Sequence, residues 1–230
     1  MDWHKTMSTI NYYISNHGIS RYHIIFAIFI IFVYPKINLA QDHPDSPKKR
    51  IVFLGNSITA GFGLTLEQAY PAIIQNKIDS LELNFDCVNA GLSGETTSGG
   101  LRRLDWLMKK PVSILIIALG GNDGLRGIPP DLSKENLEEM VKKARKKYPD
   151  IRIIIAGMEA PPNMGQDYTK KFRNIFKTPA EKMKTGYISF LLEGVGGRKE
   201  LNQADQIHPN IMGQKLVAEN VWNALKKFLN

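Results

Sequence analysis

Cysteine is almost absent from this chain, because Cys87 is the only one in 230 residues. A lone cysteine excludes an intrachain disulfide. No cluster of cysteine and histidine has the spacing of a metal site, so we expect no bound metal. Cys87 lies in a short apolar stretch, and we interpret its thiol as a buried structural group.

Histidine is nearly as scarce. Three of the five histidines precede residue 40, and His43 lies in a segment rich in proline and aspartate. Without those segments, the folded part of the chain holds one histidine, His208. Because histidine is the commonest general base near neutral pH, a hydrolase of this sequence that uses a histidine must use His208.

Long hydrophobic runs are also missing. The most apolar run, residues 22–34, follows Arg21 and precedes the small residue Ala40. It is shorter than the roughly 17–25 residues of a membrane span, and its flanks are typical of a secretory signal peptide. We therefore predict a signal peptide at residues 1–40, a linker at 41–49 and one folded domain at 50–230. The expected location is secreted or periplasmic, with an uncleaved membrane anchor as the alternative.

The chain is modestly basic. Its formal net charge is +8, and removal of residues 1–40 lowers that charge by two. The densest basic run, residues 142–147, falls at the end of a predicted helix, where cations favour the helix dipole. We interpret it as a solvated face and predict no nucleic-acid partner. Transient contact with an anionic membrane surface stays open, and nothing in the sequence indicates the oligomeric state.

The stretch IVFLGNSITAGFG, residues 51–63, combines a short apolar run with a serine and a glycine-rich turn. The apolar run is typical of a buried strand. Ser57 would then lie just past the carboxyl end of that strand, where ligands bind in open parallel sheets. A simpler interpretation makes Ser57 only the N-cap of the following helix.

Apolar runs and helical periodicities alternate along the rest of the chain. This alternation predicts an α/β fold, a three-layer sandwich in which helices cover both faces of a parallel sheet of about five strands. The expected strands are 51–54, 85–88, 113–119, 151–156 and 188–192. The expected helices are 66–81, one capped by Thr96 or Thr97, 133–147, one broken near Pro179, and one that begins at about Ile211.

Candidate catalytic residues follow several of these strands: Ser57, Gly91, Asn122, and the pair Asp205 and His208. Because parallel strands end at one edge of a sheet, we expect these residues to lie together. His208 could take the proton of Ser57 while Asp205 orients the imidazole. The N–H groups of Ser57 and Gly91 and the Asn122 amide could stabilise an oxyanion. Each residue alone also has a structural explanation as a turn or cap residue.

Four blocks, GNSIT, NAGLSGET, GGNDGLRG and DQIHPN, resemble the Ser, Gly, Asn and Asp-x-x-His blocks of the SGNH (GDSL) hydrolase superfamily. The third block is similar to that of the thioesterase I / lysophospholipase L1-like arylesterase branch. The resemblance extends from about residue 50 to the C-terminus. It implies a flavodoxin-like sandwich without a metal or organic cofactor. It also implies that Ser57 is the nucleophile, that Asp205 and His208 complete a triad, and that Ser57, Gly91 and Asn122 supply the oxyanion donors.

The same resemblance implies that the loops after the third and fourth strands border the active site. The expected substrate-binding residues are Gly124, Leu125, Arg126 and Pro161. The chain departs from the family at Asn56, where aspartate is usual. This change removes a charge beside the nucleophile but no member of the triad.

We therefore predict a serine esterase that hydrolyses acyl esters or thioesters of small molecules, such as a lysophospholipid, an aryl ester or an acyl thioester. A carbohydrate O-deacetylase on the same fold is an alternative, and so is a small-molecule binding module without turnover. The retention of Ser57, Asp205 and His208 favours an enzyme. The sequence does not select the substrate or the acyl chain length.

Overall fold

The computed structural model of the chain describes residues 47–229. The predicted signal peptide and most of the predicted linker lie outside the described residues. The sheet begins at Lys49, which pairs with Phe85 of the neighbouring strand. The Lys49 N–H donates to the carbonyl of Asn84 (3.0 Å). The first strand therefore starts inside the segment that we expected to be linker.

Five strands form one parallel sheet in the order β2-β1-β3-β4-β5. The strands are β1 (Lys49–Gly55), β2 (Phe85–Gly91), β3 (Ile114–Ala118), β4 (Arg152–Ala156) and β5 (Gly186–Ile188). The chain leaves β1 toward β2 and then returns past β1 to build β3. The strand order therefore reverses between β1 and β3, and the crevice outside their carboxyl ends is where open α/β sheets bind ligands.

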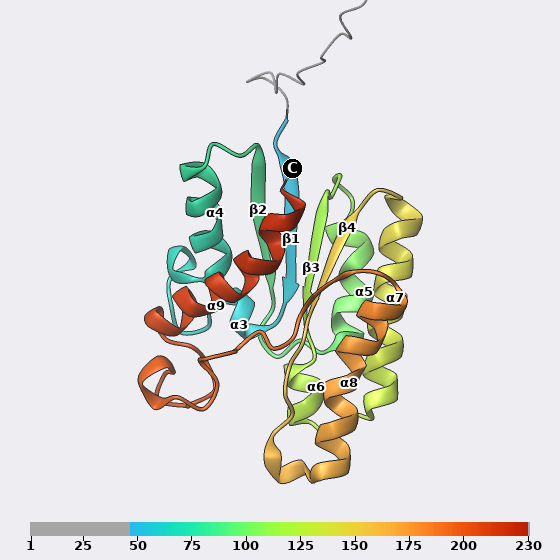
Figure 1. Ribbon diagram of the computed structural model, residues 1–230, viewed down its shortest axis with the longest axis vertical. Helices are drawn as coiled ribbons and strands as arrows, with labels where there is room; N and C mark the ends of the chain where they lie inside the picture. Colours follow the sequence, from blue (N-terminus) through green and yellow to red (C-terminus); the bar gives the residue numbers. More distant parts are fainter. Residues whose placement is uncertain (1–46, 230) are drawn as a thin grey trace, which may run out of the picture. The chain divides into compact units, whose positions relative to one another are not determined.

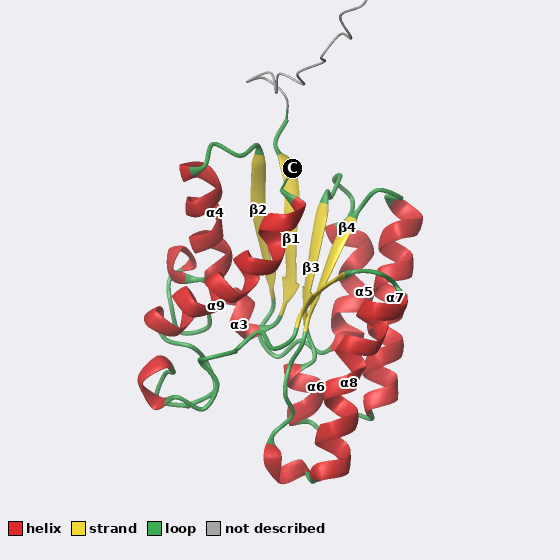
Figure 2. Cartoon of the chain, in the orientation of Figure 1, coloured by secondary structure: helices red, strands yellow, loops and turns green. Residues whose placement is uncertain are grey.

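Helices cover both faces of the sheet, which confirms the predicted three-layer sandwich (Figure 1). Helices α4 and α9 lie on one face, and α5, α7 and α8 on the other, as Figure 2 also shows. Among residues 47–229, no helix is both long and apolar enough to cross a bilayer. The helices are α3 (Ser57–Ala60), α4 (Tyr70–Ser80), α5 (Thr97–Leu107), α6 (Gly121–Leu125), α7 (Pro130–Lys147), α8 (Gln166–Lys182) and α9 (Ile211–Leu225). Short 3-10 turns are η1 (Leu66–Gln68), η2 (Pro162–Met164), η3 (Lys199–Leu201) and η4 (Lys226–Phe228).

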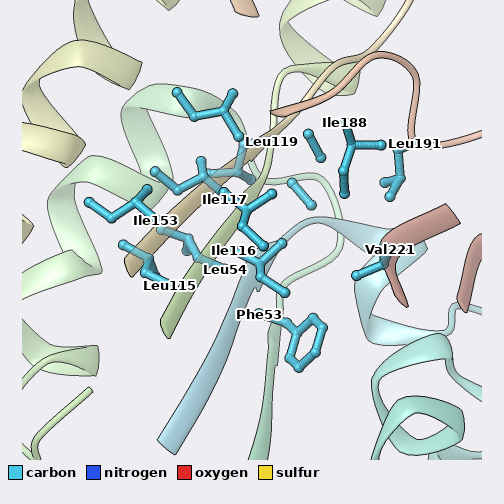
Figure 3. Close-up of a cluster of buried hydrophobic side chains, with 14 of the residues drawn as sticks. Phe53, Leu54, Leu115, Ile116, Ile117, Leu119, Ile153, Ile188, Leu191 and Val221 are labelled. Carbon is cyan, nitrogen blue, oxygen red and sulfur yellow. The ribbon is translucent and has the colours of Figure 1, made fainter. Parts of the chain in front are cut away.

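The core follows from strands that are apolar on both faces. Phe53 projects toward Val221 of α9, whereas Leu115 and Ile153 project to the other side of the sheet (Figure 3). The Phe53 ring also meets the Tyr70 ring of α4 edge to face, with centroids 5.7 Å apart. Burial of each such aliphatic or aromatic side chain stabilises the fold by roughly 1.5–3 kcal/mol. These contacts fix the position of β1 and hence of the turn that follows it.

Several element boundaries differ from the predictions. The expected helix 66–81 is interrupted at Ala69, which is extended, so that α4 begins at Tyr70 with Pro71 in its first turn. Helix α7 begins at Pro130 rather than at 133, because proline presets the backbone of a first turn. Helix α8 continues through Pro179, whose ring is buried, although proline removes one N–H donor from the helix.

The last strand was also predicted in the wrong place. The structure has β5 at Gly186–Ile188, two residues earlier than expected, and its pairing with β4 begins at Gly186 opposite Ile154. Leu191 and Leu192 are buried from a turn rather than from a strand. The hydrophobicity of residues 188–192 therefore predicted that this segment is buried, but it did not predict the backbone conformation of the segment.

Cys87 lies on β2 and is partly rather than fully buried. Burial, reinforced by the nearby carboxylates of Asp86 and Asp79, raises the pKa of its thiol to about 12. Because the thiolate is the reactive form and the thiol stays protonated at neutral pH, this cysteine is unreactive there.

Gly91, the last residue of β2, lies directly against α3. A Cβ at this position would lie 2.2 Å from the backbone N of Ala60 and 2.7 Å from the backbone C of Thr59. Helix α3 can therefore approach the end of β2 only because residue 91 is a glycine.

We expect Gly91→Ala to lower the free energy of unfolding by about 1–3 kcal/mol, since the added methyl group must displace backbone atoms. Urea unfolding measures this loss. Gly196→Ala is a matched control that should change stability little, because its Cβ would meet the Phe190 ring at 3.3 Å and the carbonyl O of Leu192 only at an ordinary contact distance of 3.6 Å. Equal stability of Gly91→Ala and the parent protein would contradict the close approach.

Candidate active site

Ser57 is the first residue of α3, at the carboxyl end of β1. The helix is capped by the buried side chain of Asn56, whose Oδ1 accepts the N–H of Ile58 (3.0 Å). The interpretation of Ser57 as the N-cap is therefore wrong, and its hydroxyl is available for another partner. Asn56 supplies the cap oxygen that an aspartate would supply at the same position.

His208 and Asp205 complete a chain of contacts with Ser57. The Ser57 Oγ lies 2.8 Å from Nε2 of His208, and Nδ1 of His208 lies 2.7 Å from Oδ2 of Asp205. With an ionised Asp205, Nδ1–H donates to the carboxylate, which leaves Nε2 of a neutral imidazole to accept the Ser57 hydroxyl proton. The structure thus brings together three of the predicted residues in the order that the prediction requires.

The Asp-x-x-His spacing has a local explanation. Oδ1 of Asp205 accepts the backbone N–H groups of Ile207 (2.9 Å) and His208 (3.0 Å), while Oδ2 faces the imidazole. The turn passes through Gln206, whose φ of +59° lies in the left-handed region. These hydrogen bonds, those of His208 first, lower the pKa of Asp205 to about 2. One carboxylate therefore holds both the loop and the ring.

Two residues that the sequence analysis did not single out fix this loop to the turn that follows α3. Gln203 donates from Nε2 to the carbonyl of Phe62 (2.6 Å), and its backbone N–H donates to the carbonyl of His208 (2.8 Å). The Phe62 ring lies against the imidazole of His208, with centroids 4.6 Å apart. No local pattern marks the contacts of Phe62 with Gln203 and His208, because they join segments far apart in the chain.

Gln214 ties α9 to the same region. It is buried, its Oε1 accepts the N–H of Tyr70 (2.9 Å), and its Nε2 donates to the carbonyl of Ile58 (3.1 Å). The helix after His208 is therefore bonded directly to the helix that carries Ser57.

A cleft of about 350 Å³ opens at Ser57 and His208. Asn122, Leu125 and Pro161 are among the residues that line it, and their roles toward a substrate stay predictions. Further apolar side chains also line the cleft, namely Ile58, Met158, Ala160, Leu192 and Ile207. The cleft also includes Glu159, whose carboxylate is neutralised by two hydrogen bonds from Arg173 (2.7 and 2.8 Å).

Besides Asp205, which reaches the cleft only through His208, three predicted residues do not line it. The Gly91 N–H donates to Oδ1 of Asn89 (3.0 Å). Gly124 is buried, and a Cβ there would meet the Phe172 ring at 3.1 Å. Arg126 donates instead to the carbonyl of Gly94 (3.0 Å). The functional roles assigned to Gly91, Gly124 and Arg126 stay predictions.

Asn122 stands on α6, a short helix that follows β3 and that the sequence analysis treated as a turn. Its Nδ2 donates to the carbonyl of Glu95 (2.9 Å). The adjacent Asp123 is fully buried and accepts hydrogen bonds from the N–H of Thr97 (2.9 Å) and the hydroxyl of Ser133 (2.9 Å). This buried carboxylate holds α6 to the starts of α5 and α7, so Asn122 stands on a rigid support.

Within the described part of the chain, no group of three or more His, Cys, Asp or Glu residues is placed to hold a metal ion. The chemistry that the cleft can supply from its own residues is that of a serine beside an imidazole, with hydrogen-bond donors nearby.

The fold and the cleft define a parallel α/β protein with a serine, a histidine and an aspartate in contact at a topological switch point. Residues 53–216 match the family model described as the GDSL-like Lipase/Acylhydrolase family. The chain belongs to this family. Membership confirms the expected resemblance and makes the chain an acyl hydrolase.

Individual relatives agree with this assignment. The chain is 39% identical to Esterase TesA of Pseudomonas aeruginosa over 78% of its own length and 89% of that protein. It is 31% identical to an Arylesterase of Vibrio mimicus, over 79% of the chain and 90% of the relative. The crystal structure of TesA superposes with a TM-score of 0.75 at 39% identity and covers 79% of this chain and 100% of that one.

We expect the Asp205 carboxyl to stay ionised as the pH falls to about 3, because its pKa is depressed to about 2. Its stabilising contribution is then fully present above the unfolded-state pKa of about 3.9 and is lost as the pH falls toward 2. A ¹³C NMR titration of the side-chain carboxyl, assigned with Asp205→Asn, measures the midpoint. A midpoint near 3.9 would contradict the hydrogen bonding described here.

Proposed function

We propose that this protein is a serine esterase that hydrolyses small acyl esters or thioesters through an acyl-enzyme on Ser57. The observation that carries the proposal is the contact chain from Ser57 Oγ to His208 Nε2 and from His208 Nδ1 to Asp205. Family membership supports the same reaction class.

In the proposed first half-reaction, Ser57 Oγ attacks the substrate carbonyl carbon while His208 Nε2 takes the hydroxyl proton. Asp205 holds the imidazole in the required tautomer and stabilises the imidazolium. As the tetrahedral intermediate collapses, the bond to the alcohol or thiol breaks, and His208 protonates the leaving group. A water molecule, deprotonated by His208, then attacks the carbonyl carbon of the acyl-enzyme. The bond between this carbon and Ser57 Oγ breaks, His208 returns the proton to Oγ, and the acid leaves.

We propose three groups as donors to the oxyanion. The N–H of Ser57 belongs to the first turn of α3, where N–H groups have no partner within the helix. Asn122 borders the cleft and has a second Nδ2 proton besides the one that it donates to Glu95. Gly91 would join them by exchanging its bond to Asn89 for one to the substrate. One such donor is typically worth about 3 kcal/mol of transition-state stabilisation.

The lining of the cleft favours an uncharged acyl group. Half of its side chains are apolar, and the charge of Glu159, the one carboxylate among the lining residues, is balanced by Arg173. Three curated relatives are named Esterase TesA, Arylesterase and Thioesterase 1/protease 1/lysophospholipase L1. We therefore propose an aryl ester, an acyl thioester or a lysophospholipid as the substrate class, ahead of an acetylated sugar.

Fluorophosphonate labelling tests the nucleophile. We expect one covalent adduct on Ser57 at neutral pH, and Ser57→Ala should lose both the adduct and at least about 1,000-fold of the rate on p-nitrophenyl esters. His208→Ala should also abolish turnover, and Asp205→Asn should lower it less. The exposed Ser80, which donates to the carbonyl of Lys77, provides a matched Ser→Ala control that keeps full labelling. Labelling that persists in Ser57→Ala would overturn the proposal.

We also propose that the protein is exported. The support is the order of Arg21, the apolar run 22–34 and Ala40 in the sequence. Intact-mass measurement of the protein recovered from cells should give a chain that begins at Gln41. A full-length mass would favour the membrane-anchored alternative instead.

A further inference from the structure

Arg103 and Glu95 form an ion pair next to the cleft but outside its lining. Arg103 Nε donates to Glu95 Oε1 (2.6 Å), and Nη2 donates to Oε2, so the pair is bidentate. The Glu95 side chain is only 4% exposed and that of Arg103 21%. Removing two charges from water costs free energy, which the pair can offset only if its remaining polar atoms also form hydrogen bonds.

The guanidinium also reaches backbone carbonyls at the carboxyl ends of two strands. Nη2 lies 2.5 Å from the carbonyl O of Ala90 and 3.4 Å from that of Gly55. The carbonyl of Ala90 and the N–H of Gly91 belong to one planar, trans peptide group. A group that fixes the direction of this carbonyl therefore also fixes the direction of the Gly91 N–H.

Glu95 reaches a second donor through its backbone. Its carbonyl O accepts Nδ2 of Asn122 (2.9 Å) and thereby fixes the rotation of that side-chain amide. The residue whose carboxylate holds Arg103 thus also holds Asn122. The Gly55 carbonyl, which makes the longer contact with Arg103, belongs to the last residue of β1, two residues before Ser57.

We propose that the Arg103–Glu95 pair is the positioning element that sets the directions of the oxyanion donors, Gly91 and Asn122. This inference rests on the proposed function, because it assigns the pair a role in the same reaction. Arg103 and Glu95 do not border the cleft, so they act through the backbone of Ala90 and through Asn122 rather than on the substrate. The planar fork of arginine suits this task, since one guanidinium can meet a carboxylate and a carbonyl at fixed angles.

Steady-state kinetics on p-nitrophenyl esters test the role of Arg103. We expect Arg103→Met to lower kcat by about 10- to 100-fold with KM within about two-fold, because misdirected donors weaken the transition state more than the bound substrate. Arg103→Lys should recover part of kcat, since an ammonium can neutralise Glu95 but cannot reproduce the fork. If Arg103→Met does not fold, the comparison of Arg103→Lys with the parent protein still measures the loss.

Arg145 provides the matched control. It also donates to two backbone carbonyls, those of Met183 (2.7 Å) and Lys184 (3.3 Å), but none of these residues lines the cleft. Arg145→Met should therefore lower the melting temperature without changing kcat. Unchanged kcat in both Arg103 variants, or an equal loss of kcat in Arg145→Met, would overturn the positioning role alone. A parent protein whose ester hydrolysis does not depend on Ser57 would instead overturn the proposed function and this inference with it.

Discussion

The parallel pairing of β1 with β2 and β3 is the constraint on which the site depends. In this register Gly55 is opposite both Gly91 and Ala118, so the three strands reach the edge of the sheet together. The residues that follow each strand then emerge at the same height. A shift of one residue in either pairing would move an entire set of side chains to the opposite face of the sheet and would separate these residues.

Two kinds of interaction convert this common edge into a rigid cleft. Local ones belong to single turns, such as the Asn56 cap of α3 and the carboxylate of Asp205 within its own loop. Long-range ones join segments far apart in the chain, such as Gln214 with α3 and Asp123 with the start of α5. The local interactions shape each functional segment, and the buried long-range hydrogen bonds set the distances between segments.

The sequence predicted most of the fold because the central strands are apolar at nearly every position and their helices have clear periodicity. It also predicted which residues gather at the sheet edge, since a parallel topology is enough to bring them together. It missed the early start of β5 and the helix α6, where buried residues or glycine-rich turns are compatible with more than one backbone conformation. It also missed Gln203, Phe62 and Arg103, because a contact between distant segments has no periodic signal in one sequence.

The cleft draws its essential parts from opposite ends of the folded chain. Ser57 follows the first strand, whereas His208 arrives only after the last one, in a loop held in place by Gln203 and by the helix that ends at Leu225. During synthesis the serine is thus present long before its imidazole partner. In a nascent or C-terminally truncated chain that lacks His208, the Ser57 hydroxyl has no imidazole partner, so this contact forms only after the last loop of the chain has been made.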